Sequence, residues 1–159
     1  MKHIQLFENF ERKKTIAIYG LPGSGKSTLT KEIIKLYPSM DYVVYDDFKY
    51  KDALQRMGQE NQIIADGMLH FKARSELVNR AESTNTELQR IYFANDTKQA
   101  EVNYLERSQK ADAEKQHKYP SQIQSLTKRY GEKIPVGEIT VPVWKPGIDM
   151  SSIVKSILG

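Results

Sequence analysis

The sequence predicts an α/β fold, and three observations lead to that prediction. Short β-prone apolar segments alternate along the chain with segments whose apolar residues recur at helical spacing. A glycine-rich loop joins the first of these strands to the first helix. Hydrophobic residues make up 39% and charged residues 28% of the 159 residues, as is typical of one globular domain. Because such alternation implies parallel strands with right-handed crossovers, we expect a three-layer fold around a five-stranded parallel sheet.

The local patterns predict where the strands and helices lie. Strands are expected over residues 15–19, 42–45, 62–65, 87–93 and 137–143. Helices are expected from the glycine-rich loop to Pro38, and over 47–58, 70–83, 97–109, 120–130 and 150–158. Asp149 or Ser151 is the expected N-cap of the last helix, because a short polar side chain there accepts from an unpaired backbone N–H.

Two segments are expected to stand apart from this core. Residues 1–13 form a short amphipathic lead-in, in which Ile4, Phe7 and Phe10 share one helical face. That face is expected to pack on the domain formed by residues 14–159, with a partner protein as the alternative. Residues 108–119 are polar and basic, which indicates an exposed loop or a mobile lid.

Composition limits the location of the protein and the kind of partner. No apolar run approaches 18 residues, and the N-terminal segment lacks the apolar core of a secretory signal. The absence of cysteine fits a reducing cytoplasm, so we expect a cytoplasmic protein that does not enter a membrane. A net charge of +4 suits an anionic partner, either a nucleotide or a nucleic acid, without choosing between them. The oligomeric state stays open.

The glycine-rich loop carries the most specific motif of the chain. Residues 20–27 read G-L-P-G-S-G-K-S and match the phosphate-binding pattern G-x-x-x-x-G-K-[ST]. The glycines let successive N–H groups turn toward a phosphate, at the positive end of the following helix. The expected ATP-binding residues are Gly20, Pro22, Gly23, Ser24, Gly25, Lys26, Ser27 and Thr28. Lys26 supplies charge to the β- and γ-phosphates, and Ser27 offers its hydroxyl to Mg²⁺.

Two acidic sites point from phosphate binding to phosphoryl transfer. Asp46 and Asp47 follow the second strand, and Asp66 follows the third. Ligands of parallel sheets bind at the carboxyl ends of strands, so these side chains are expected beside the loop. One of Asp46 and Asp47 is expected to accept the proton of an attacking hydroxyl. The alternative is a cap of the next helix, and the pair also allows one residue in each role. Asp66 is the second expected ligand of Mg²⁺, together with Ser27.

Positive charge opposite the loop is the last part of the predicted site. The transition state of phosphoryl transfer spreads negative charge over oxygens that arginine or lysine stabilises. Arg107 and Lys110 lie where the helix over 97–109 meets the lid segment, and they are the expected catalytic cations.

On these motifs the chain resembles the small phosphate-loop kinases, and most closely the kinase domain of phage-type polynucleotide kinases. The family pattern G-x-P-G-S-G-K-S-T is matched by residues 20–28, D-D-[YF]-[RK] by 46–49, and V-x-x-L-x-R-x-x-K by 102–110. The resemblance spans about residues 14–130. It implies a phosphate-loop NTPase kinase fold with a lid, and a location in the host cytoplasm if the gene belongs to a phage.

The resemblance also assigns roles to residues of the acceptor site. It implies that Asp46 is the general base, that Lys49 helps to hold the acceptor beside Asp47, and that Asp66 is the third acidic position. The chain departs from the family at Ala111, where a second lid arginine is usual. Either Lys110 replaces that arginine, or the contact to the donor phosphate is weaker.

Three functions are consistent with these motifs. The first is an ATP- and Mg²⁺-dependent kinase for a hydroxyl of a nucleic acid or nucleotide, either a 5′-hydroxyl or a hydroxymethylated base. The second is a kinase of a nucleoside, a nucleoside monophosphate or a metabolite; a monophosphate acceptor calls for several arginines, and only Arg56 lies between the second and third strands. The third is a non-catalytic nucleotide-binding regulatory module. GTP is disfavoured, because residues 95–98 carry the residues of a base-reading motif in the wrong order.

The single tryptophan has two possible roles. Trp144 and Pro146 lie near the last predicted strand, where they either border the adenine or pack in the core or at its edge. Packing is the preferred role, because a lone tryptophan is more often buried than used as a platform for a base.

Overall fold

A five-stranded parallel sheet forms the centre of the molecule, as the sequence predicts. The computed structural model describes residues 12–46, 49–65, 74–108, 130, 134 and 138–159. Its strands are β1 (Lys14–Tyr19), β2 (Val43–Asp46), β3 (Gln62–Ala65), β4 (Glu87–Phe93) and β5 (Ile139–Val141). Their order in the sheet is β2-β3-β1-β4-β5, and all neighbours run parallel.

The strand register brings the ends of three strands to one level. Ile18 of β1 lies opposite Ala65 of β3, and Ala65 lies opposite Asp46 of β2. β1 is the buried central strand, with every residue from Thr15 to Tyr19 inside. The apolar run of β1 therefore fixes the position at which the glycine-rich loop leaves the sheet, beside the ends of β2 and β3.

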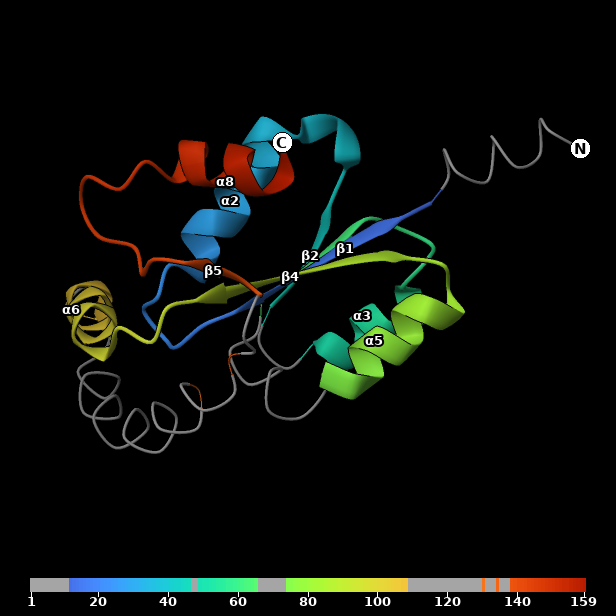
Figure 1. The fold of residues 1–159 in the computed structure, drawn as a ribbon, viewed down its shortest axis with the longest axis horizontal. Coiled ribbons are helices and arrows are strands. Elements are labelled where there is room, and N and C mark those ends of the chain that lie inside the picture. Colours follow the sequence, from blue (N-terminus) through green and yellow to red (C-terminus); the bar gives the residue numbers. More distant parts are fainter. Residues whose placement is uncertain (1–11, 47–48, 66–73, 109–129, 131–133, 135–137) are drawn as a thin grey trace, which may run out of the picture.

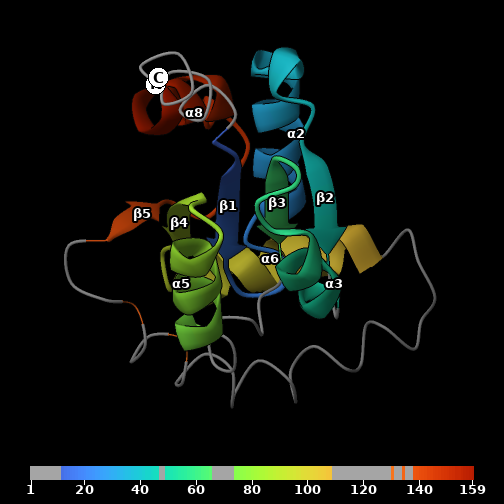
Figure 2. The same ribbon diagram turned by 90° about the vertical axis from the view of Figure 1, so that its right-hand side faces the viewer.

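Helices cover both faces of the sheet. They are α2 (Lys26–Leu36), α3 (Tyr50–Arg56), α5 (Arg74–Ser83), α6 (Thr97–Ser108) and α8 (Met150–Leu158), with a 3₁₀ turn at Pro38–Met40. Figure 2 shows α2 and α8 on one face of the sheet and α3 and α5 on the other. Helix α6 lies beyond the carboxyl ends of the strands (Figure 1). The three-layer prediction is confirmed.

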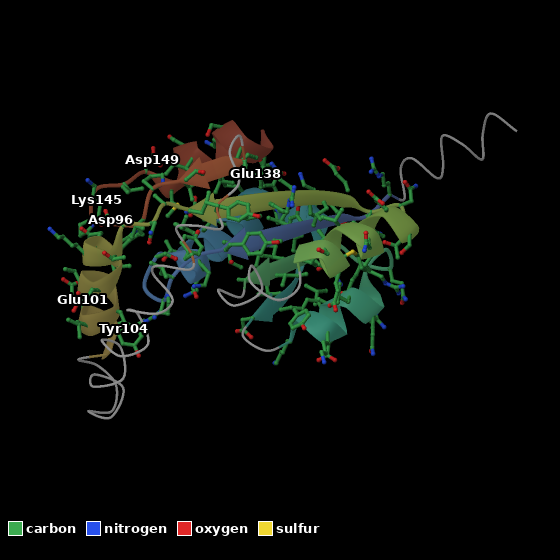
Figure 3. All side chains as sticks on the ribbon, turned by 60° about the horizontal axis from the view of Figure 1, so that its bottom comes forward. Asp96, Glu101, Tyr104, Glu138, Lys145 and Asp149 are labelled. Carbon is green, nitrogen blue, oxygen red and sulfur yellow. The ribbon has the colours of Figure 1, made fainter. Side chains whose placement is uncertain are left out.

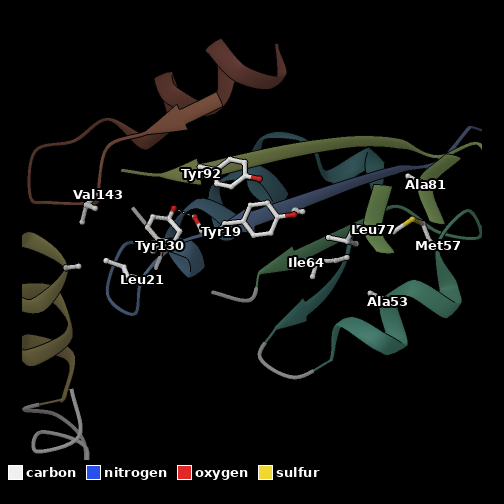
Figure 4. Close-up of a cluster of buried hydrophobic side chains, with 12 residues drawn as sticks. Tyr19, Leu21, Ala53, Met57, Ile64, Leu77, Ala81, Tyr92, Tyr130 and Val143 are labelled. Atoms are coloured by element: carbon white, nitrogen blue, oxygen red, sulfur yellow. Dashed lines mark hydrogen bonds between the residues drawn. The ribbon is translucent and has the colours of Figure 1, made fainter. Parts of the chain in front are cut away.

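Each face of the sheet has its own hydrophobic core, because successive residues of a strand point to opposite faces. The core on the side of α3 and α5 is drawn in Figure 4. Its buried members include Ala17, Tyr19, Ala53, Met57, Ile64, Leu77, Tyr92, Tyr130 and Val143. The core on the side of α2 and α8 includes Ile16, Ile18, Leu29, Ile33, Ile63, Ile91, Phe93, Val141 and Val154.

Most predicted elements are found close to their predicted bounds. β3, β4 and α8 begin and end where the sequence predicts, while β5 is shorter than the predicted strand over 137–143. β5 ends at Val141 because Pro142 has no N–H to donate to a neighbouring strand. The predicted lead-in up to residue 11, the lid over 109–119 and the helix over 120–129 lie outside the described residues.

The predicted cap of the last helix is Asp149 rather than Ser151. Its carboxylate accepts from the Ser152 backbone N–H at 3.2 Å and from the Ser152 hydroxyl at 2.6 Å. These two hydrogen bonds hold the pKa of Asp149 below its ordinary value, because they favour the charged carboxylate.

Candidate active site at the phosphate-binding loop

The glycine-rich loop connects β1 to α2 in a backbone shape that requires glycine. Gly23 has φ of +85° and Gly25 of +112°, a region that other residues rarely adopt. Within the loop, the Ser24 N–H donates to the Leu21 carbonyl at 3.0 Å. The Gly25 carbonyl accepts from Leu29 N–H at 2.9 Å, the first hydrogen bond of α2. The loop thus ends directly at a helix N-terminus.

The N-terminus of α2 concentrates positive charge at the loop. Lys26 opens the helix, and no acidic residue lies in the first turn. The Lys26 ammonium donates to the carbonyls of Gly20 at 2.9 Å and Leu21 at 3.1 Å, so it lies against the loop. Ser27 and Thr28 are exposed in the same turn. Helix dipole and lysine together favour an anion at this place.

Asp46 and Lys49 lie at the neighbouring strand end. Asp46 is the exposed last residue of β2, and the Lys49 N–H donates to its carbonyl at 3.1 Å. Lys49 is exposed and directly precedes the first residue of α3. Asp47 and Asp66 lie outside the described residues, although Ala65 at the end of β3 directly precedes Asp66.

Two residues, Asn103 and Trp144, make hydrogen bonds with the backbone of the loop, and we call this pair the wall of the loop. The Trp144 N–H, in the connection from β5 to α8, donates to the Ser24 carbonyl at 2.8 Å. Asn103 of α6 donates through its side-chain amide to the carbonyls of Gly23 at 2.9 Å and Trp144 at 2.6 Å. Trp144 is partly buried against the core of α2 and α8, which agrees with the packing role predicted for it.

Arg107 lies one turn beyond the part of α6 that touches the loop. Its guanidinium lies 5.6 Å from the centre of the Tyr104 ring, and Tyr104 packs against Gly23. Figure 3 labels Tyr104 and Glu101 on α6 and Lys145 on the neighbouring connection. Arg107 is exposed, whereas Lys110 lies outside the described residues.

The donor set predicted for Mg²⁺ fits that ion chemically. A serine hydroxyl and a carboxylate are hard oxygen ligands, and Mg²⁺ keeps several waters, so two protein ligands suffice. Ser27 is exposed in the first turn of α2. Across the residues that the structure describes, no three histidine or acidic side chains gather into a metal-binding group.

Tyr130 is a structural residue of the site that the sequence did not reveal. Its hydroxyl lies 3.0 Å from the Tyr19 carbonyl and 2.5 Å from the Phe93 carbonyl. Burial raises the pKa of Tyr130, with a smaller contribution from Tyr92, so the phenol stays neutral and able to donate. Tyr130 therefore holds the ends of β1 and β4, directly before the glycine-rich loop.

Comparison with known proteins agrees with this geometry. A family model described as ABC transporter matches residues 5–134, which include the loop and four of the strands. No curated protein sequence matches the chain. No helix among the described residues has the length and apolar character needed to cross a bilayer.

Solved structures with the same fold include two proteins described as kinases. A putative kinase from Chloroflexus aurantiacus has a TM-score of 0.59 at 16% identity, covering 92% of this chain and 99% of that one. Kti12 of Chaetomium thermophilum, solved with ADP-AlF3, has a TM-score of 0.56 at 18% identity, with 91% and 100% covered. A fungal RNA kinase has a TM-score of 0.51 at 13% identity, with 92% and 84% covered. The chain has the fold of a phosphate-loop kinase.

Proposed function

The chain belongs to the ABC transporter family, and from that premise we propose that it transfers the γ-phosphate of ATP to a hydroxyl group of a nucleic acid or nucleotide. The family match covers the segment that carries the phosphate-binding loop. The kinases that share the fold support transfer to an acceptor over simple hydrolysis. Since their sequences are under 20% identical to this one, the acceptor is inferred from the residues of this chain.

The observation that carries the proposal is the position of Asp46. It lies in register with Ala65, which lies in register with Ile18, two residues before the loop begins. A carboxylate at this level faces the same edge of the sheet as the phosphate-binding loop. This position supports Asp46 as the group that accepts the proton of a hydroxyl attacking the terminal phosphate.

The other residues divide between the two substrates. Lys26 and the loop N–H groups hold the phosphates of ATP, and Ser27 with Asp66 holds Mg²⁺. When bound, Mg²⁺ neutralises charge on the phosphate oxygens. Arg107 and Lys110 are proposed to stabilise the charge of the transition state from the side of α6.

The charges around Asp46 favour an acceptor without a free phosphate group of its own. Arg56 is the arginine between β2 and β3, and its Nε donates to the Glu60 carboxylate at 2.8 Å. Glu60 raises the pKa of Arg56, so this guanidinium is already matched with a carboxylate. Lys49 beside Asp46 is exposed and is proposed to contact the acceptor. This arrangement supports a hydroxyl on a polynucleotide or nucleoside more than a nucleoside monophosphate.

Transfer of labelled γ-phosphate from ATP to a panel of acceptors tests the proposal. The panel is 5′-hydroxyl DNA and RNA, hydroxymethylated DNA, nucleosides and nucleoside monophosphates. Label in a polynucleotide supports the proposed function, whereas label only in a nucleoside or monophosphate moves the protein to the small-molecule kinases. ATP binding without transfer to any acceptor would make it a nucleotide-binding module.

Salt dependence distinguishes the acceptors independently of turnover. A polynucleotide held through its backbone releases counterions, so the logarithm of its binding constant falls with the logarithm of the salt concentration, with a slope of about −0.7 per contacted phosphate on single strands. A nucleoside has no backbone phosphate and shows almost no slope. Binding of a 5′-hydroxyl oligonucleotide is measured between about 50 and 200 mM salt. Failure to bind at the low end, with efficient transfer to a nucleoside, contradicts the polynucleotide acceptor.

A further inference from the structure

The side chain of Asn103 makes hydrogen bonds with every part of its amide. Its Nδ2 donates to the carbonyls of Gly23 at 2.9 Å and Trp144 at 2.6 Å. Its Oδ1 accepts from the Gln99 Nε2, one turn earlier on α6, at 3.0 Å. A primary amide has two N–H donors, and both are used on backbone carbonyls. Gln99 fixes which end of the amide faces the loop.

The acceptors of this amide set the direction of the loop peptides. In a trans peptide the C=O of one residue and the N–H of the next point in opposite directions. The Gly23 carbonyl faces Asn103, and the Ser24 carbonyl faces the Trp144 N–H at 2.8 Å. The N–H groups of Ser24 and Gly25 are therefore turned away from this wall, and that of Ser24 donates within the loop to the Leu21 carbonyl at 3.0 Å. Phosphate-binding loops work through successive N–H groups turned to one side.

The contact between α6 and the loop is close at the backbone level. A Cβ added to Gly23 would lie 2.2 Å from the Ala100 carbonyl and 3.1 Å from the Tyr104 nitrogen. Only a glycine fits between the loop and α6 at this position. The loop and α6 are therefore in direct contact at Gly23, beside the hydrogen bonds of Asn103.

We propose that Asn103 is a positioning residue of the phosphate-binding loop, which fixes the Gly23 peptide and the Trp144 backbone in the arrangement that binds nucleotide. The inference rests on the proposed binding of ATP at this loop. Asn103 acts through the backbone and touches no substrate. Its loss leaves the carbonyls of Gly23 and Trp144 without this donor, and the loop N–H groups lose a fixed direction.

The test compares two single substitutions on α6. Asn103→Leu keeps the size of the side chain and removes both donors, and Val102→Leu, at an exposed site on the same helix, serves as the matched control. Calorimetric titration with ADP and Mg²⁺ is expected to show a dissociation constant about tenfold higher for Asn103→Leu and less than about twofold higher for the control. In the transfer assay, KM for ATP rises while KM for the acceptor stays within about twofold.

A second measurement follows the fluorescence of Trp144 during ADP titration. Trp144 is the single tryptophan of the chain, so all tryptophan fluorescence reports on the surroundings of this one residue. ADP is expected to change this signal in the wild type at a lower concentration than in Asn103→Leu. A purely structural role would lower the thermal midpoint of Asn103→Leu and leave the ADP affinity of the folded protein unchanged.

Each result has a defined meaning. If the wild type does not bind ADP, the proposed function fails before Asn103 is considered. If the wild type binds and Asn103→Leu binds equally well, or if the control weakens binding as much, the positioning role is wrong. Should Asn103→Leu not fold, Asn103→Asp keeps the shape without the N–H donors, and wild-type affinity of that variant overturns the inference.

Discussion

The hydroxyl of Tyr130 lies 2.5 Å from the carbonyl of Phe93, at the end of the strand beside the central one. The same hydroxyl is 3.0 Å from the Tyr19 carbonyl, so one buried side chain joins β1 to β4 (Figure 4). Tyr130→Phe removes this donor without opening a cavity. We expect the free energy of unfolding to fall by about 1–3 kcal/mol, because buried carbonyls lose their partner. Urea unfolding at pH 7 measures the change, and Tyr37→Phe, at a half-buried site on the other face, is the control.

The raised pKa values of two tyrosines lead us to expect a loss of stability in alkaline solution. Burial, then Glu87, raises the pKa of Tyr42 from 10.0 to about 12, and burial raises that of Tyr130 as well. A raised pKa means that the folded protein holds the phenolic proton more tightly than the unfolded chain. Their stabilisation is therefore complete below about pH 10 and is lost as the pH rises through the folded pKa values. Urea midpoints from pH 8 to 11 are expected to fall less steeply in Tyr42→Phe and Tyr130→Phe than in the wild type.

Lys26→Ala is expected to abolish phosphate transfer and leave the fold intact. The change removes the charge proposed to act on the β- and γ-phosphates and little packing, since the ammonium lies against loop carbonyls. We expect a loss of at least about 100-fold in kcat/KM. Lys31→Ala, an exposed lysine on the same helix, is the matched control. A kcat/KM of Lys26→Ala within threefold of the wild type corresponds to a loss of at most about 0.65 kcal/mol of transition-state stabilisation. Such a result would contradict the assignment of the loop as the ATP-phosphate site.

Asp46→Asn tests the general base. The amide keeps the shape of the carboxylate and accepts no proton, so kcat should fall by about 100-fold or more with little change in ATP affinity. Asp52→Asn, exposed in the first turn of α3, is the control. Asp47→Asn is expected to be milder. If Asp47→Asn is the inactive variant and Asp46→Asn is active, the base is Asp47.

Gly23→Ala and Gly147→Ala distinguish the backbone strain of a non-glycine residue at positive φ from the steric clash of an added Cβ. Both glycines have positive φ, +85° for Gly23 and +92° for Gly147. An added Cβ meets the Ala100 carbonyl at 2.2 Å in the first and nothing within 4 Å in the second. Gly147→Ala should therefore lose about 1–2 kcal/mol of unfolding free energy through its backbone alone. Gly23→Ala should lose more and also weaken ADP binding; equal losses would show that the contact with α6 relaxes freely.

Local patterns explain what the sequence predicted well. β3 and α8 have the predicted bounds because apolar residues and the Asp149 cap act within a few residues. The phosphate-binding loop was found for the same reason, as its motif is contiguous. The fold class followed from these segments and their order.

The remaining parts of the site depend on partners far apart in the chain. Asn103 meets Gly23 across 80 residues, and Tyr130 meets Tyr19 across 111 residues. No spacing rule connects such pairs, and an asparagine inside a helix or a tyrosine after a polar segment is unremarkable by itself. The sequence therefore predicted the groups proposed to contact substrate and missed those that hold the backbone in place.

The central place of β1 determines when during synthesis the loop can take its shape. Its partners are β3 and β4, with Thr15 opposite Gln62 and Lys14 opposite Glu87. Strand β1 therefore gains both of its neighbours only after these two later segments have been synthesised. The wall of Asn103 and Trp144 is completed later still. The loop precedes all of these partners in the chain, so ATP binding stabilises only a chain in which the later segments have already folded.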